Sequence, residues 1–224
     1  MMQLHDGHVT VQKFFTAANA SSYDSVARYA TFGQDAAWKR RIVDEMRDRH
    51  LILELACGTG ILTSMLTRAG KSVTGLDLTF HYLAESRKRT DFNIAQGTAE
   101  ALPHREEQFD AVVSSYLAKY VDSGTVVGEC KRVLRHGGTV VFHDFCYPRD
   151  SVMRRLWKSY FLILRFCGIF SPSWRAVFDE LDNFIENSRW EKRTLDALNE
   201  SGFTNISIKY HTLGTAAIIT AEKP

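Results

Sequence analysis

The stretch "LILELACGTG", residues 51–60, decides the fold that this chain is expected to adopt. An apolar run of strand length contains one acidic residue, Glu54, and ends in Gly58 and Gly60, which are separated by a single residue. Glycines at such a place let the backbone approach a ligand closely, because they carry no Cβ. The stretch therefore predicts a strand followed by a ligand-binding turn.

The rest of the chain repeats this unit. Helix-like segments cover residues 61–69, 80–90 and 123–135, after two helices predicted within 9–48. Further apolar runs of strand length cover residues 72–77, 92–97, 109–116 and 137–145. A largely helical region, 150–202, precedes two last strands, 204–210 and 213–221, with no helix between them. The pattern predicts an α/β fold, a Rossmann-like seven-stranded mostly parallel sheet with helices on both faces and one antiparallel strand from the final hairpin.

Composition excludes several classes of protein. A net charge of +2 gives no support to a nucleic-acid partner, which would need a clustered basic face. The four cysteines are widely spaced and form no zinc-ligand pattern, so we expect free thiols and no metal. The first thirty residues lack a signal-peptide pattern, and no apolar run reaches about 18 residues. We therefore expect a cytoplasmic protein.

The acid in the first strand restricts the ligand. Ligands of open α/β sheets lie beyond the carboxyl ends of the strands, so Glu54 would be close to one. A carboxylate there disfavours a pyrophosphate and suits a ligand that carries positive charge. A dinucleotide fingerprint fails as well, because Thr63 stands where its third glycine belongs. At the end of the second strand, Asp77 can accept hydrogen bonds from both hydroxyls of a ribose.

These residues lie in segments that resemble a known superfamily. In order, "ELACGTG", "GLDL", "GTAEALP", "FDAVVSSY" and "RVLRHGGTVVFHDF" are similar to the motifs of class I S-adenosylmethionine-dependent methyltransferases. More narrowly, "YDSVARYATFGQDAAWKRR", "SYLAKYV" and "LNESGFTNISIKYHTLGTAAII" resemble the ubiquinone/menaquinone biosynthesis C-methyltransferases. Together the segments extend the resemblance over nearly the whole chain.

The resemblance implies a cofactor site and a domain organisation. S-adenosylmethionine, with S-adenosylhomocysteine as product, is expected to bind Tyr23, Glu54, Ala56, Gly58, Thr59, Gly60, Asp77, Leu78, Thr98, Ala99 and Ser115. We expect one domain over 1–224, made of an N-terminal helical cap (1–48), a cofactor-binding core (49–148), a helical lid or substrate segment (149–190) and a final helix with a β-hairpin (191–224).

The residues expected at the substrate side of the site depart from the family pattern. Ala27 stands where the family usually has Asn, and the family's "GLRN" is here "LAKY", residues 117–120. His104 replaces a Phe, and the glutamate that ends the fifth strand is Asp144, preceded by His143. Methyl transfer is therefore better supported than any particular quinone.

Catalysis can be argued from residue types. The ring carbon of a hydroquinone becomes nucleophilic once a neighbouring phenol loses its proton, and a positive side chain stabilises that phenolate. Lys119, aligned with the family's Arg, is the candidate, either as a fixed charge or as a base. Other candidates are Tyr23, Tyr120, His143 and Asp144, of which the last two should point to opposite faces of a strand.

Residues 153–174 are the most lipophilic part of the chain and carry interspersed arginines and a lysine. They suit a helix at the inner face of a membrane, a lid over a lipophilic aromatic substrate, or a core helix. A homodimer stays open. The expected activity is C-methylation of a prenylated quinol or related aromatic lipid. The alternatives are a small-molecule O- or N-methyltransferase and a non-catalytic, cofactor-binding scaffold of a lipid-quinone biosynthetic complex.

Overall fold

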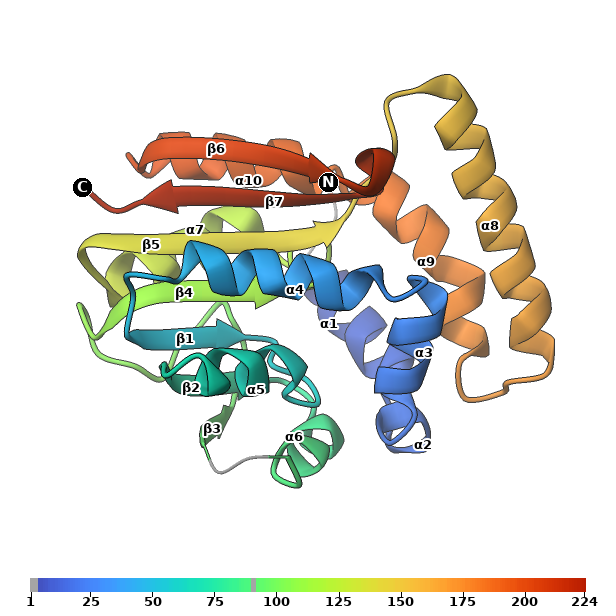
Figure 1. Cartoon of the computed structure of the whole chain (residues 1–224), viewed down its shortest axis with the longest axis horizontal. Helices are drawn as coiled ribbons and strands as arrows, with labels where there is room; N and C mark the ends of the chain where they lie inside the picture. The colour runs from blue at the N-terminus through green and yellow to red at the C-terminus, as the bar shows by residue number, and fades with distance from the viewer. Residues whose placement is uncertain (1–3, 90–91) are drawn as a thin grey trace.

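The computed structural model describes residues 4–89 and 92–224, and its centre is a seven-stranded sheet (Figure 1). The strands are β1 (Leu51–Leu55), β2 (Ser72–Asp77), β3 (Asn93–Gln96), β4 (Phe109–Ser115), β5 (Leu134–Phe145), β6 (Thr204–His211) and β7 (Ala216–Glu222). They lie in the order β3-β2-β1-β4-β5-β7-β6, and β7 runs antiparallel to both of its neighbours. The predicted fold class and its single antiparallel strand are confirmed.

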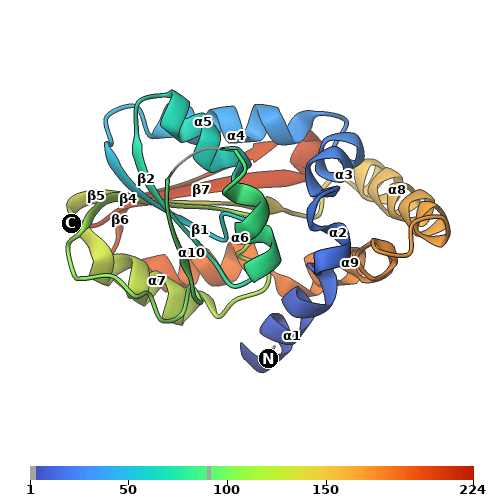
Figure 2. The ribbon, with the colours of Figure 1, turned by 90° about the horizontal axis from the view of Figure 1, so that it is seen from below.

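Helices cover both faces of the sheet. Figure 2 shows α4 (Gln34–Glu45) and α5 (Ile61–Arg68) on one side, and α7 (Ser123–Val133) and α10 (Trp190–Glu200) on the other. The side chains of β1 alternate between these layers, as the two-residue period of a strand requires. Leu53 packs in the cluster that contains Trp190, and Ile52 packs in the cluster that contains Ile42. Glu54 has the parity of Ile52 and so faces α5.

The N-terminal region differs from its prediction. The two helices expected within 9–48 are four: α1 (Leu4–Phe14), α2 (Ala17–Ala20), α3 (Tyr23–Ala30) and α4. Thr16 adopts extended backbone and caps α2, with its N–H donated to Asn19 Oδ1 at 3.0 Å. Gly33, at φ 77°, occupies the left-handed region that turns the chain between α3 and α4. These local breaks divide a stretch of sequence whose hydrophobic periodicity alone predicts longer, continuous helices.

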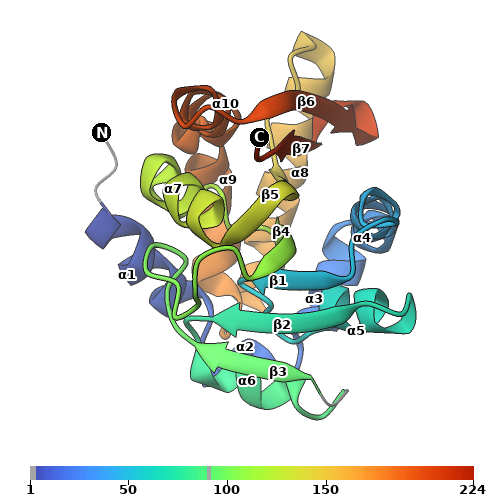
Figure 3. The ribbon, with the colours of Figure 1, turned by 90° about the vertical axis from the view of Figure 1, so that its left-hand side faces the viewer.

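The last helical region forms a separate layer beyond the strand ends. In Figure 1, α8 (Ser151–Ile169) and α9 (Arg175–Ser188) lie side by side next to α1, α2 and α3, and Figure 3, seen from the opposite end of the sheet, shows α8 and α9 behind the strands. Phe14, Tyr120, Trp174 and Phe178 pack together between these helices and the sheet. In the part of the chain that the structure describes, no helix is long and apolar enough to cross a membrane.

Element boundaries shift by a few residues. The helix expected over 80–90 is α6 (Phe80–Ser86), and residue 90 of that expectation lies outside the described part of the chain. The helix expected over 123–135 ends at Val133, because β5 begins at Leu134 and pairs there with Phe109 of β4.

Candidate active site

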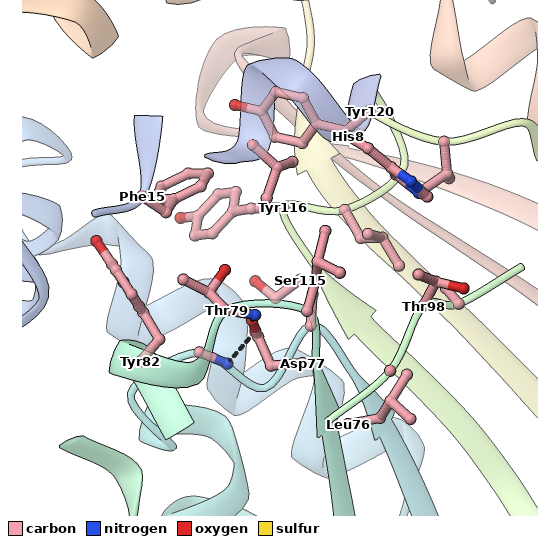
Figure 4. Close-up of a pocket in the computed structure, with 18 of the residues that line it drawn as sticks. His8, Phe15, Leu76, Asp77, Thr79, Tyr82, Thr98, Ser115, Tyr116 and Tyr120 are labelled. Carbon is pink, nitrogen blue, oxygen red and sulfur yellow. Dashed lines mark hydrogen bonds between the residues drawn. The ribbon is translucent and has the colours of Figure 1, made fainter. Parts of the chain in front are cut away.

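A large cavity of about 720 Å³, including space open to solvent, lies beyond the carboxyl ends of β1, β2 and β4. Figure 4 shows Asp77 and Thr79 on one side of this large cavity, with His8 and Tyr120 on the opposite side. Its lining includes these predicted site residues: Tyr23, Ala56, Gly58, Asp77, Leu78, Thr98, Ala99, Ser115 and Tyr120. Residues from widely separated sequence motifs therefore meet in one space.

The glycine turn after β1 is fixed by Asp77. Its Oδ2 accepts the N–H of Gly58 at 2.8 Å, and its Oδ1 accepts the N–H of Thr79 at 2.7 Å. Gly58 has φ 55° and Gly60 has φ 78°, which glycine adopts without steric cost. Burial raises the pKa of the Asp77 carboxyl, and the two amide hydrogen bonds oppose that effect. The Thr79 hydroxyl also donates to this carboxylate, so the acceptor sites that its two oxygens offer a ligand are shared with that hydroxyl.

A second, smaller cavity of about 280 Å³ adjoins the first and carries buried charge. Lys39, Glu54 and Thr59 line this charged cavity. Glu54 accepts a hydrogen bond from the hydroxyl of Thr63, and burial raises the pKa of Glu54 to about 8. Thr59 donates its hydroxyl to Asp24 at 2.6 Å, which ties the glycine turn to α3. Gly60 is not among the residues that line any of these cavities.

A third cavity, of about 690 Å³, is aromatic and apolar. It lies between α3, α8 and α9, and we call it the aromatic cavity. Its lining includes Phe15, Phe145, Trp157, Tyr160, Phe161, Leu164, Trp174 and Phe178. Tyr23 and Tyr116 line all three cavities, so the cavities converge on these two phenol rings.

Lys119 stands at the wall of the aromatic cavity, although only 1% of the residue is exposed. Its Nζ donates to Asp144 Oδ1 at 2.7 Å and to the carbonyl oxygen of Tyr116 at 3.0 Å. The same ammonium lies 4.4 Å from the centroid of the Tyr120 ring. Burial lowers the pKa of Lys119, and the charge of Asp144 opposes the shift. Asp144 itself is fully buried and lines none of the three cavities.

The neighbouring residue of β5 serves a different part of the site. His143 Nδ1 lies 2.9 Å from Ser115 Oγ, on the opposite face of the strand from Asp144. Burial lowers the pKa of His143 well below its ordinary value, so the ring is neutral. Burial likewise raises the pKa values of Tyr23 and Tyr120 well above the usual range. Neither phenol is therefore suited to act as a base near neutral pH.

Three residues at or next to the junction of the cavities were not predicted. Tyr116 donates its hydroxyl to Asp35 Oδ1 at 2.8 Å, and Lys39 pairs with the same carboxylate. The only signal in the sequence was the i, i+4 spacing of Asp35 and Lys39, which is common on solvated helix faces. Their burial depends on packing against Tyr116, 77 or more residues away in the chain.

Comparisons with known proteins identify the family to which this chain is related. A sequence profile described as a methyltransferase domain matches residues 53–142. A demethylmenaquinone methyltransferase from Thermus thermophilus is 30% identical over 218 residues, which cover 92% of this chain and 98% of that protein. The chain belongs to the ubiquinone/menaquinone biosynthesis C-methyltransferase family. It is an S-adenosylmethionine-dependent enzyme, and the family likeness favours catalysis over the non-catalytic scaffold.

Other relatives agree with this assignment. A ubiquinone/menaquinone biosynthesis C-methyltransferase from Desulfotalea psychrophila is 29% identical over 219 residues, covering 93% of this methyltransferase and 88% of that protein. Among solved structures, an S-adenosylmethionine-dependent methyltransferase from Thermotoga maritima has a TM-score of 0.67 at 17% identity, with 96% of this chain and 100% of that chain covered. At that identity the solved structure supports the fold alone.

Proposed function

We propose that this methyltransferase methylates a ring carbon of a prenylated quinol or a related aromatic lipid. The observation that carries the proposal is the junction of the aromatic cavity with the large cavity at Tyr23 and Tyr116. An acceptor ring held in the aromatic cavity would lie next to a cofactor held in the large cavity. Such positioning supplies much of the rate enhancement in a displacement reaction.

The residues of the large and charged cavities fit S-adenosylmethionine, which when bound supplies a methyl group on a positively charged sulfonium. The Asp77 oxygens would accept the two ribose hydroxyls at the acceptor sites not used by the Gly58 and Thr79 amides, with the Thr79 hydroxyl as competitor for one of them. Leu78 and Ala99 offer apolar walls for a flat base. Glu54, a buried acid that lines the charged cavity, would bind the ammonium group of the cofactor.

Lys119, held by its ion pair with Asp144, would supply the positive charge that stabilises the acceptor. Two of the three N–H groups of Lys119 bond to Asp144 Oδ1 and the Tyr116 carbonyl, and no described residue accepts the third. That N–H would stabilise the oxygen of a phenolate in the aromatic cavity. Burial lowers the pKa of Lys119 and so favours the neutral amine, and in that form Nζ would instead take up the phenol proton and become the ammonium beside the phenolate.

The lining of the aromatic cavity supports an aromatic acceptor over an amine. None of the described residues that line it is acidic, so a cationic substrate would find no carboxylate there and would be repelled by the Lys119 ammonium. Trp157 and Tyr160 stack with ring centroids 5.2 Å apart, and Phe161 packs edge-on at 5.0 Å from Trp157. Flat rings of this kind favour a flat apolar substrate. A small-molecule N-methyltransferase is thus the weaker alternative.

The outer face of α8 supports contact with a lipid surface. Leu162, Ile163 and Phe166 are each more than 60% exposed, while the inward Phe161 is only 2% exposed. The sequence of α8 contains Arg154, Arg155, Lys158 and Arg165 and no acidic residue. Exposed apolar side chains beside basic ones are typical of helices that lie in a membrane interface. The aromatic cavity is directly behind this helix, so a lipid acceptor could enter from the surface.

A comparison of the lipid-quinone profiles of cells with and without this protein tests the proposal. We expect cells without it to accumulate a quinone that lacks one ring methyl group, and the wild-type gene to restore the methylated species. An unchanged profile in cells that make quinones would contradict the assignment of the acceptor, while leaving the methyltransferase fold in place.

A further inference from the structure

Lys39 is a buried cation at the edge of the charged cavity, and the acceptor chemistry does not use it. Only 4% of the residue is exposed, and the residues that line the same cavity include Glu54, which is 2% exposed. Burying a charged group is costly unless polar partners compensate. The cavity therefore presents a cation and an acid that are both withdrawn from water.

The position of the Lys39 ammonium is fixed by two neighbours. Asp35, one helical turn earlier in α4, pairs with it, and the Asp35 Oδ1 also accepts the Tyr116 hydroxyl at 2.8 Å. The ammonium lies 4.8 Å from the centroid of the Tyr116 ring. Asp35 thus ties the lysine to the ring on which the three cavities converge. An ammonium has three N–H groups, so donors remain for a further partner.

The charged cavity continues from the large cavity. Both are lined by Tyr23, Ala56, Gly58, Ser115 and Tyr116. A cofactor whose ribose binds at Asp77 would extend its other end past Tyr116 into the charged cavity. That end of S-adenosylmethionine carries an ammonium and a carboxylate on one carbon, and it requires a site with charges of both signs.

We propose that Lys39 binds the carboxylate of the amino-acid end of S-adenosylmethionine. Glu54, which lines the same cavity, is the acidic partner for the ammonium. The charge of Lys39 acts across this space, because it opposes the effect of burial on the Glu54 carboxyl. Asp35 and Tyr116 hold the lysine in place, and its role is independent of which acceptor is methylated.

Calorimetry with matched ligands separates this role from a structural one. The probes are S-adenosylhomocysteine and its decarboxylated analogue, which differ only in the carboxylate. Lys39→Met should weaken binding of S-adenosylhomocysteine by about 10- to 100-fold, as expected for one charge-assisted hydrogen bond. The affinity for the decarboxylated analogue should change by less than about threefold, so the variant loses most of the wild type's preference between the two ligands.

Two further variants keep the test decisive. Lys39→Met leaves Asp35 without its partner, so a combined Asp35→Asn and Lys39→Met variant preserves an acceptor for the Tyr116 hydroxyl if the single variant folds poorly. Arg40→Met removes a cation from the exposed neighbouring position and should leave both affinities unchanged. An equal loss of affinity for both ligands, or no loss for either, would overturn the role of Lys39. Neither result would bear on the conclusion that the protein is a methyltransferase.

Discussion

Lys119 Nζ lies 2.7 Å from Asp144 Oδ1, and both side chains are at least 98% buried. A pair of opposite charges in such a place costs desolvation free energy, so it is poor evidence for a purely stabilising role. The position of Lys119 at the wall of the aromatic cavity connects the pair with the acceptor instead. The pair can therefore be tested for stability and for catalysis separately.

Lys119→Met alone should destabilise the fold by about 3–5 kcal/mol, because it leaves the Asp144 carboxylate buried without a partner. A double variant, Lys119→Met with Asp144→Asn, should recover most of that stability in urea unfolding, because the amide oxygen is neutral and still accepts the backbone N–H groups of Lys119 and Phe145. Its turnover number should nonetheless be about 10²–10⁴ lower than that of the wild type, with affinity for S-adenosylhomocysteine within a few-fold. Near-normal turnover in the double variant would remove Lys119 from the mechanism.

Asp77→Ala should reduce the binding of S-adenosylhomocysteine by about 2–4 kcal/mol, since two hydrogen bonds to a charged acceptor are lost. Asp110→Ala is a matched control, because Asp110 also accepts two backbone N–H groups, from His50 and Leu51, at the start of β1. We expect calorimetry to show little change in affinity for that control. Equal affinity losses in both variants would mean that Asp77 acts only through the fold.

The outer face of α8 can be tested apart from its inner face. Leu162→Ser with Phe166→Ser should weaken co-sedimentation with anionic liposomes and raise KM for long-tailed acceptors, leaving a truncated soluble quinol analogue much less affected. Phe80→Ser removes a similarly exposed aromatic residue, at 62% exposure, from α6 and should change neither measurement. Unaltered sedimentation of the α8 variant would argue against the lipid contact.

Glu54 predicts a pH dependence of stability. Its carboxyl has a pKa of about 8 in the folded protein and an ordinary value near 4.5 when unfolded, so the folded state binds more protons between these values. The contribution of Glu54 to the free energy of unfolding is thus largest below about pH 4.5. It falls by about 1.4 kcal/mol per pH unit as the pH rises toward 8. Glu54→Gln should flatten that slope in urea unfolding at pH 5.5, 7 and 8.5. A slope equal to that of the wild type would show that Glu54 ionises normally.

The sheet and its glycine turn could be predicted because they depend on local features. The apolar run 51–55, the glycines after it and Asp77 each act through neighbours in the same strand-turn-helix unit. The two-residue period of a strand was enough to separate His143 from Asp144, and the structure gives them different partners, Ser115 and Lys119.

Long-range packing decides what the sequence did not reveal. Lys39 and Asp35 form an i, i+4 pair like any on an exposed helix, and only the approach of Tyr116 makes the pair part of a cavity. Similarly, the lipophilic segment 153–174 gives no indication of which residues face inward. The structure assigns Phe161 and Leu164 to the aromatic cavity and Leu162 and Phe166 to the surface.

The most direct test of the proposed activity locates the transferred methyl group. Purified enzyme is incubated with S-adenosylmethionine that carries a deuterated methyl group and with a demethylated prenylated quinol, and the product is analysed by mass spectrometry and NMR. The account predicts a deuterated methyl group on a ring carbon, formed by the wild type and strongly reduced in the variant with Lys119→Met and Asp144→Asn. Label on an oxygen, or no labelled quinol from an enzyme that binds S-adenosylhomocysteine, would contradict it.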